Sequence, residues 1–441
     1  MISGESGIDF QRIHSLKKIL ATVLILSFAA GGLFVSSRQK NADPRERLLQ
    51  LYKAHRYFEL HDALAEKKND ASPELDFFRA VAANTCNRLN EAIVGLLSYL
   101  QGGPTDTPRP LAKDAWINLA DTYCRSGQYR KAGEAYRLIL ERFGAELDAA
   151  QKSNYENQAI LWPALAGVPP QSVDVFKDSA IPMEKRSFPI RIKDKVIYVW
   201  YDTGASLSVL TESAAQDLGL ALLGSGLKIQ SATGKWIDSR VAVVSELRLG
   251  EAVVRNAVFL VLRDELLPVR QVRPGVERRG LIGMPILTAL KEFIETKEGR
   301  LLIPAAPRPR SSRNMLFFGF KPIVEVLHRG DRLSLCVDIG SSATFLYPPF
   351  FRRYREDIES HSKLRNITMG TLGGSRTVAA HILDEFAFRL ADRNVSLPKI
   401  IVHTEETHRE SAYFDGVLGR DVLARCSRMI FNFESMSFIL E

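Results

Sequence analysis

The sequence predicts a multidomain fold: one transmembrane helix near the N-terminus, an all-α region of helical repeats, and a mostly-β region made of two lobes. Three observations predict it. Residues 19–37 carry no charged side chain, residues 43–165 are rich in Leu, Ala and Tyr at helical spacing, and residues 186–441 consist of short β-branched runs between turn residues. At about 150 residues per domain, a chain of 441 residues is too long for one compact domain.

The composition is that of a folded protein. Hydrophobic residues make up 46% of the chain and charged residues 25%, which excludes a mostly disordered, collagen-like or polytopic membrane protein. The net charge is +8, but the basic residues are scattered rather than gathered in one stripe, so we expect no nucleic-acid partner. The chain has four cysteines, too few for a disulfide-built scaffold, and none of them has zinc-ribbon spacing: Cys86, Cys124, Cys336 and Cys426.

The charge-free run at 19–37 predicts a single membrane crossing. As a helix it would be about 28 Å long, close to the hydrocarbon thickness of a bilayer. The basic residues before it are Arg12, Lys17 and Lys18. They predict that residues 1–18 stay in the cytoplasm and that the rest is exported, so 19–37 is a signal anchor in the inner (cytoplasmic) membrane and the bulk lies in the periplasm or extracytoplasmic space.

A cleaved signal peptide is the alternative interpretation of the same run. Its first part resembles a hydrophobic signal core, and the small residues at 29–31 offer a cleavage site.

Residues 43–165 are expected to form helical repeats. A set of large and small residues in this region has the spacing of a tetratricopeptide repeat, in which two helices bury each other's side chains: Trp116, Leu119, Ala120, Tyr123, Gly127, Tyr129, Ala132 and Tyr136. A weaker copy places Ala83 and Ala92 opposite Tyr123 and Ala132. Such repeats provide either a docking surface for a protein partner or a spacer that holds the next domain off the membrane, and both interpretations stay open.

A disulfide between neighbouring repeats is a further possibility. Cys86 and Cys124 both fall late in the first helix of a predicted repeat, so a bridge is geometrically conceivable in an oxidising compartment.

The mostly-β region contains an internal duplication. A hydrophobic strand runs into Asp202-Thr-Gly, and a Leu-Ile-Gly motif follows later and ends at Gly283. A second strand runs into Asp338-Ile-Gly, and a Val-Leu-Gly motif follows it and ends at Gly419. Both Gly motifs open a short helix. The interval from 202 to 283 equals the interval from 338 to 419, and chance is a poor account of this equality. We therefore infer a tandem duplication whose period is the separation of Asp202 and Asp338.

The duplication divides this region into two lobes. Lobe 1 is predicted at 186–303 and lobe 2 at 314–441, joined by the Pro- and Arg-rich linker 304–313.

A strand ending in Asp-Thr-Gly, a mid-domain turn and a hydrophobic-hydrophobic-Gly motif before a helix resemble the aspartic proteases, and the segment 417–423 is similar to the retropepsin-like (clan AA) form. The resemblance implies that each lobe gives one loop and that the carboxyl groups of Asp202 and Asp338 meet across a pseudo-twofold axis. It implies support of these loops by Thr203, Gly204, Ser206, Gly340 and Ser341. It implies flaps near Gly234, Trp236, Gly373 and Gly374. The rival arrangement is a homodimer that pairs two first lobes.

The predicted chemistry needs neither a cofactor nor a metal. Two carboxylates about 3 Å apart repel by roughly 5 kcal/mol at an effective dielectric of 20, so they share one proton. The ionised carboxyl then activates a water that attacks a peptide carbonyl, while the protonated one stabilises the oxyanion. His403 and His408, near Glu405 and Glu406, are expected to lie solvated in a loop rather than to bind a metal.

The sequence therefore predicts a membrane-anchored aspartic endopeptidase that hydrolyses extracytoplasmic proteins or peptides. One residue departs from the pattern, because Ile339 stands where a second Thr is expected. We expect Thr203 to find another partner, Asp338 to be held mainly by its glycine turn and by Ser341, and the enzyme to be slow or selective. On the same grounds, Ile339→Thr is expected to raise turnover. The alternative is a catalytically silent, protease-like scaffold that binds peptides or partner proteins.

Overall fold

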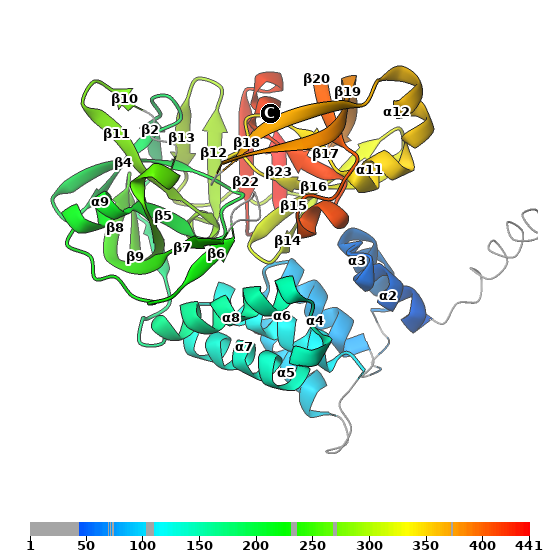
Figure 1. The fold of residues 1–441 in the computed structure, drawn as a ribbon, viewed down its shortest axis with the longest axis horizontal. Coiled ribbons are helices and arrows are strands. Elements are labelled where there is room, and N and C mark those ends of the chain that lie inside the picture. The colour runs from blue at the N-terminus through cyan, green and yellow to red at the C-terminus, as the bar shows by residue number, and fades with distance from the viewer. Residues whose placement is uncertain are drawn as a thin grey trace, which may run out of the picture.

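The computed structural model describes residues 44–441 except for 69, 71, 73–74, 103–109, 231–235, 268–270 and 372–373. The predicted membrane segment 19–37 lies outside the described residues, and none of the described helices is long and apolar enough to cross a membrane. A helical region comes first in the chain and a mostly-β region follows it (Figure 1). This order confirms the predicted succession of an α region and a β region.

The helical region is a layer of helices that lie side by side in chain order. Its elements are α2 (Pro44–Lys53), α3 (Tyr57–Ala65), α4 (Asp76–Thr85), α5 (Leu89–Gln101), α6 (Ala112–Arg125), α7 (Tyr129–Phe143), the 3-10 turn η2 (Gly144–Glu146) and α8 (Ala149–Ala164). Small buried residues let neighbouring helices approach, as at Ala83, Ala92 and Ala132, which are fully buried. The four cysteines are free, so the bridge considered between Cys86 and Cys124 is not formed. The tetratricopeptide assignment stays a prediction.

Lobe 1 is built on a sheet in the order β1-β9-β5-β11-β4-β3-β8. Its elements are β1 (Ser172–Val175), β2 (Ser179–Pro182), β3 (Phe188–Ile192), β4 (Lys195–Tyr201), β5 (Ser208–Thr211), α9 (Glu212–Asp217), β6 (Lys228–Gln230), β7 (Trp236–Asp238), β8 (Arg240–Leu249), β9 (Ala252–Leu262), η3 (Asp264–Leu266), β10 (Gln271–Arg273), β11 (Val276–Ile282), α10 (Met284–Ala289), β12 (Glu292–Thr296) and β13 (Arg300–Ile303). β1 and β2 precede residue 186, where the sequence predicted the lobe to begin.

Lobe 2 is built on a sheet in the order β14-β15-β16-β21-β17-β20-β19-β18. Its elements are β14 (Met315–Phe318), β15 (Lys321–His328), β16 (Asp331–Val337), β17 (Phe345–Leu346), α11 (Pro348–Arg353), α12 (Arg355–His361), β18 (Arg365–Thr371), β19 (Gly374–Leu390), β20 (Arg393–His403), η4 (Arg409–Ala412), β21 (Gly416–Leu418), η5 (Arg420–Arg425), β22 (Arg428–Asn432) and β23 (Ser437–Leu440).

The two lobes repeat the same strand register. In lobe 1, Trp200 pairs with Leu281 where β4 lies parallel to β11. In lobe 2, Cys336 pairs with Val417 where β16 lies parallel to β21. Both partners are shifted between the lobes by the same offset that separates Asp202 from Asp338. The inferred duplication therefore extends from sequence spacing to hydrogen-bonded register.

A shared sheet joins the lobes in the order β2-β13-β12-β22-β23. At its centre β12 and β22 run antiparallel, and Ile294 pairs with Ile430, which is its own counterpart one period of the duplication later. A pseudo-twofold axis thus passes through this pair. One apolar core of buried side chains continues through both lobes and this sheet, which makes them a single packed unit.

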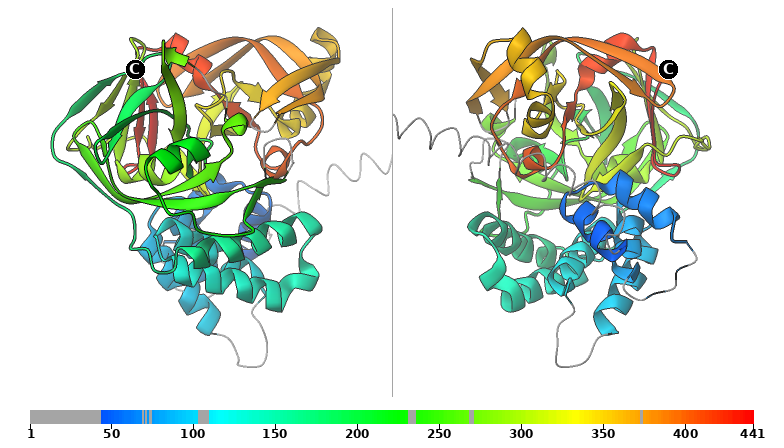
Figure 2. Two further views of the ribbon diagram at one scale, coloured as in Figure 1. Left: turned by 60° about the vertical axis from the view of Figure 1, so that its left-hand side comes forward. Right: turned by 90° about the vertical axis from the view of Figure 1, so that its right-hand side faces the viewer.

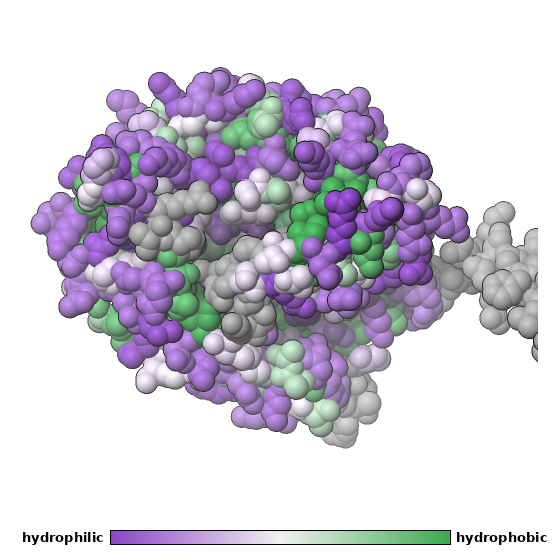
Figure 3. Space-filling model, turned by 45° about the horizontal axis from the view of Figure 1, so that its top comes forward, coloured by the Kyte–Doolittle hydropathy of each residue, from purple (hydrophilic) through white to green (hydrophobic). Residues whose placement is uncertain are grey.

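The helical layer lies against the lobes (Figure 2), and residues of its helices and of the turns between them contact the lobes. His55, in the turn after α2, lies with its ring 3.8 Å from that of Tyr413. The guanidinium of Arg125, at the end of α6, lies 4.6 Å from the ring centre of Phe317 in β14. The α and β regions therefore share a buried interface. The face shown in Figure 3 is mostly hydrophilic, with apolar side chains in separate patches.

Candidate active site

Asp202 and Asp338 occupy equivalent places at the carboxyl ends of β4 and β16. Asp202 N donates to Ile282 O at 2.9 Å, and Asp338 N donates to Leu418 O at 3.1 Å. Each aspartate is thus held by the strand that lies parallel to its own. The glycines that end the two Gly motifs also make equivalent hydrogen bonds. Gly283 N donates to Ser208 Oγ and Gly419 N donates to Thr344 Oγ1, both at 3.0 Å.

The two aspartates meet between the lobes. A Cβ atom on Gly204 would lie 2.6 Å from Cγ of Asp338, and one on Gly340 would lie 2.4 Å from Oδ2 of Asp202. Each carboxyl group therefore rests against the glycine of the opposite loop, where no side chain fits. The two carboxyl groups are close enough for the side chain of Asp338 to help raise the pKa of Asp202.

Main-chain N–H groups orient the carboxyl groups. Gly204 N donates to Asp202 Oδ1 at 2.8 Å, and Ser341 N donates to Asp338 Oδ1 at 3.1 Å. The hydroxyl of Ser341 donates instead to Ala343 O at 2.8 Å, so Ser341 supports Asp338 through its backbone and not through its side chain. Ser206 is exposed.

Thr203 finds its partners in the main chain of the opposite loop rather than in a side chain at 339. Its hydroxyl donates to Val337 O at 2.8 Å and accepts from Ile339 N at 3.0 Å, so it spans the opposite Asp loop. Both partners are main-chain groups, which do not depend on the side chains at 337 and 339. Ile339 is itself buried in the shared apolar core, and its side chain returns no hydrogen bond to lobe 1.

The electrostatics favour one proton on the pair. Burial and the negative charge of Asp338 raise the pKa of Asp202 to about 7, while the Gly204 N–H group and the positive charge of Arg186 act in the opposite direction. Two ionised carboxylates that lie side by side repel each other strongly in a site from which most water is excluded. Near neutral pH the arrangement therefore provides one proton donor and one acceptor.

A buried ionic network beside the pair was missed by the sequence analysis. Glu295 in β12 is fully buried, forms an ion pair with Arg420 and accepts a hydrogen bond from the hydroxyl of Tyr201. Arg186 lies beside it and donates through Nη2 to Ile339 O at 2.5 Å. Of these residues, only Arg420 could be identified from a sequence pattern, since it directly follows the second Gly motif. No pattern identified Arg186 or Glu295, because their partners lie far away in the chain.

The flap candidates fall on β-hairpins in the two lobes. Gly234 and Gly373 lie outside the described residues, between β6 and β7 and between β18 and β19. Trp236 begins β7 and is 38% exposed, and Gly374 begins β19, where it pairs with Thr371. The hairpin of lobe 1 is tied to the helical layer, because Lys228 N donates to the side chain of Asn157 in α8 at 2.9 Å.

The expectation of solvated histidines at 403 and 408 is wrong for His403. It ends β20, is buried, and stacks on Phe345 with ring centres 5.2 Å apart. Burial, with smaller contributions from His408 and Arg376, lowers the pKa of His403 to about 4. His408 accepts or donates a hydrogen bond at 2.9 Å to the hydroxyl of Tyr347. Among the described residues no group of three His, Cys, Asp or Glu side chains is placed to hold a metal ion.

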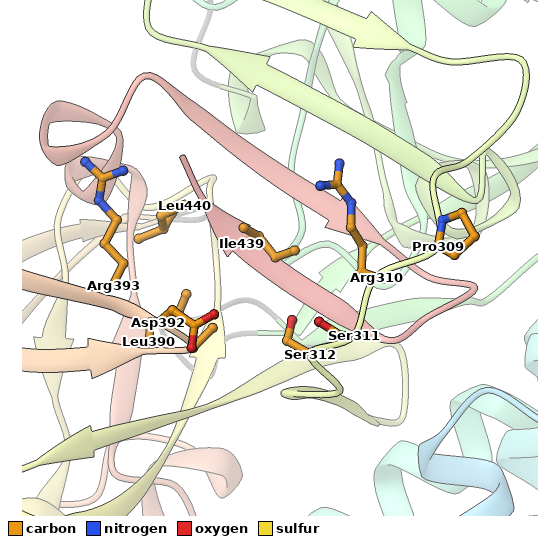
Figure 4. A pocket seen from close by; sticks show the side chains of 10 residues that line it. Pro309, Arg310, Ser311, Ser312, Leu390, Asp392, Arg393, Ile439 and Leu440 are labelled. Carbon is orange, nitrogen blue, oxygen red and sulfur yellow. The ribbon is translucent and has the colours of Figure 1, made fainter.

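A cavity of about 620 Å³ lies elsewhere on the lobes (Figure 4). It is lined by the linker at 309–312, by the turn between β19 and β20, and by the end of β23. Neither aspartate borders it, so it is separate from the paired carboxyl groups.

Comparison with known proteins agrees with this geometry. Residues 188–286 match the family described as aspartyl protease, which confirms the resemblance to aspartic proteases and indicates a protease. The solved structures that match include a retropepsin-like aspartic protease from Rickettsia conorii, with 22% sequence identity and a TM-score of 0.21, covering 31% of this chain and 94% of that chain. No curated protein matches the chain.

Proposed function

We propose that the chain is a membrane-anchored aspartic endopeptidase that hydrolyses peptide bonds of extracytoplasmic proteins or peptides. One observation carries the proposal: Asp202 and Asp338 each lie against the glycine of the opposite loop, so both carboxyl groups face one point between the lobes. The raised pKa of Asp202, about 7, supports a proton shared by the pair near neutral pH.

The proposed reaction uses this shared proton and one water molecule. The ionised carboxyl takes a proton from the water, whose oxygen attacks the peptide carbonyl carbon. The protonated carboxyl donates to the carbonyl oxygen as it gains negative charge. When the tetrahedral intermediate collapses, a proton passes to the leaving nitrogen, so water is added across the C–N bond and the pair regains its starting protonation.

A cleavage assay with the full-length chain in detergent tests the proposal. A peptide library is incubated between pH 4 and pH 8, and products are identified by mass spectrometry, with and without a statine-type transition-state mimic. We expect cleavage that the mimic blocks and that both Asp202→Asn and Asp338→Asn abolish. Peptide binding without cleavage by the wild-type protein at any pH would favour the silent scaffold. Full activity of Asp338→Asn would favour the homodimer of first lobes.

The membrane anchor is part of the proposal and rests on the sequence of residues 19–37. The protein would cross the inner membrane once and keep residues 44–441 in the periplasm or another extracytoplasmic space. Reporter fusions at the C-terminus test this topology. A reporter that is active only in the cytoplasm should be inactive when it is fused to the C-terminus. Activity of that fusion would overturn the topology.

We also infer that the helical layer is tetratricopeptide-like. The inference is supported by the antiparallel pairs α4–α5 and α6–α7 and by the burial of Ala83, Ala92 and Ala132 at their contacts. A protein partner and a spacer role remain the two proposed uses of this layer. Pull-down with the full-length chain, with and without substitutions of exposed residues on α5 and α7, distinguishes them.

A further inference from the structure

The ties between the two Asp loops are asymmetric. Thr203 of lobe 1 holds the loop of lobe 2 through Val337 O and Ile339 N, but Ile339 has no polar side-chain atom with which to reciprocate. A second tie to the same loop comes from a different part of lobe 1. Nη2 of Arg186, located just before β3, donates to Ile339 O at 2.5 Å. The lobe 2 loop is therefore held from lobe 1 at both the N–H and the C=O of residue 339.

The backbone that presents Arg186 is strained. Glu184 and Ser187 exchange two main-chain hydrogen bonds of 2.8 Å, so Lys185 and Arg186 form a two-residue turn. Both turn residues have positive φ, 46° at Lys185 and 69° at Arg186. A turn with positive φ at both positions strongly favours Asn-Gly, because glycine lacks a Cβ and asparagine tolerates the left-handed region better than most other residues, including Lys and Arg. Strain of this kind persists only where the surrounding structure over-determines it, here through the paired main chain of Glu184 and Ser187 and the contact of Arg186 with Ile339.

The guanidinium of Arg186 also lies within the charged surroundings of the pair. The groups that interact with it electrostatically are Arg420, Glu295, Tyr201 and Asp202. Glu295 is already paired with Arg420, so the positive charge of Arg186 is left to act on Asp202 as well. On the lobe 2 side, Lys321 forms an ion pair with Glu410 at 2.8 Å, and both Lys321 and His408 interact electrostatically with Asp338.

We propose that Arg186 is a positioning residue of the aspartate pair, which fixes the Asp338 loop from lobe 1 in place of a threonine at 339. Arg186 does not touch the reacting atoms in this scheme. It acts through the main chain of Ile339, the residue that follows Asp338, and through its charge near Asp202. The inference rests on the proposed protease function, since it assigns Arg186 a role in that same site. It also changes the expectation for Ile339→Thr, which should raise turnover little while Arg186 is present.

The first test removes the guanidinium. Arg186→Met keeps much of the length of the side chain, and we expect kcat to fall by about 10- to 100-fold, with KM changed little, because small displacements of catalytic groups reduce rates by such factors. The upper limb of the pH profile should move to higher pH, since a cation that favours the Asp202 carboxylate is lost. Arg186→Lys should keep the pH profile but not the full kcat. The control is Lys185→Met in the same turn, whose side chain is exposed and which should retain wild-type activity.

The second test separates positioning from folding. Replacing Lys185-Arg186 by Asn-Gly relieves the turn, so Tm should be higher than in Arg186→Met, which loses the same hydrogen bond, while kcat should fall as in Arg186→Met. Adding Ile339→Thr to Arg186→Met should recover part of the lost kcat. Wild-type kcat and pH profile in both the Met and the Asn-Gly variants would overturn the positioning role and leave the protease proposal intact. A wild-type protein without Asp202-dependent cleavage would overturn both.

Discussion

Replacing Thr203 by valine tests how the two lobes are held together. The substitution keeps the shape of the side chain and removes only the hydroxyl, which is fully buried and makes two hydrogen bonds to the main chain of lobe 2. Without it, Val337 O and Ile339 N lose that hydroxyl as a partner in an interior without room for replacement. Stranding a buried polar group costs about 1–3 kcal/mol, so the two groups together should cost roughly 2–6 kcal/mol in the free energy of unfolding.

The corresponding loss of thermal stability is measurable. For a unit of about 250 residues, 1 kcal/mol shifts Tm by roughly 2–4 °C, so Thr203→Val should lower Tm by roughly 4–24 °C. Thr203→Ser is the matched control, because it keeps the hydroxyl and loses one methyl group, at about 1 kcal/mol. Thermal unfolding of both variants is followed by calorimetry. Equal Tm values for the two variants would refute the reasoning, since the hydroxyl would then contribute nothing to the contact between the lobes.

Three further predictions concern pH, the buried carboxylate and the helical interface. Because the pKa of Asp202 is raised to about 7 in the folded state, the folded protein binds this proton more tightly than the unfolded chain, and the free energy of unfolding should fall as pH rises from about 4 to about 7. Urea unfolding at several pH values gives the free energy of unfolding as a function of pH. This free energy should fall less steeply with pH in Asp202→Asn than in the wild type. The same pH dependence in both proteins would contradict a raised pKa of Asp202. Glu295→Gln should lower the free energy of unfolding by about 3–5 kcal/mol, because it leaves Arg420 without its buried counter-charge. Glu434→Gln is the control; it removes one partner of an exposed ion pair and should change the free energy of unfolding by less than about 1 kcal/mol. Arg125→Met should increase hydrogen exchange in α6 and β14, with the exposed Arg130→Met as control, and equal exchange in both means that the contact with Phe317 does not hold the helical layer.

The duplication could be predicted because its evidence is local. Each Asp loop and each Gly motif is a short run of adjacent residues, and two equal intervals are visible without knowing the fold. The structure adds a consequence of the same spacing, the identical pairing of Trp200 with Leu281 and of Cys336 with Val417. The glycines of the loops were also predictable, because only glycine fits against the opposite carboxyl group.

The ionic network could not be predicted because its partners are distant in the chain. Arg186 reaches Ile339 across 153 positions, and Glu295 reaches Arg420 across 125, so no short window of sequence contains both partners. β1 was missed for a related reason. It is a short strand with no fully buried residue, and its place is determined by pairing with β9, which comes much later in the chain. His403 was misjudged because the acidic residues after it indicated a loop, whereas it lies at the buried end of β20.

The hydrogen bonds of Thr203 have a consequence for the side chain at 339. The sequence predicted another partner for Thr203, because Ile339 offers no polar side-chain atom. The hydroxyl of Thr203 bonds to main-chain groups, and every residue at 339 except proline supplies the N–H it needs. The bonds made by Thr203 therefore place no demand on the side chain at 339. Since the described side-chain ties to this loop, from Thr203 and Arg186, both come from lobe 1, substitutions that loosen the pair should concentrate in lobe 1, whereas residue 339 should tolerate other apolar side chains of similar volume.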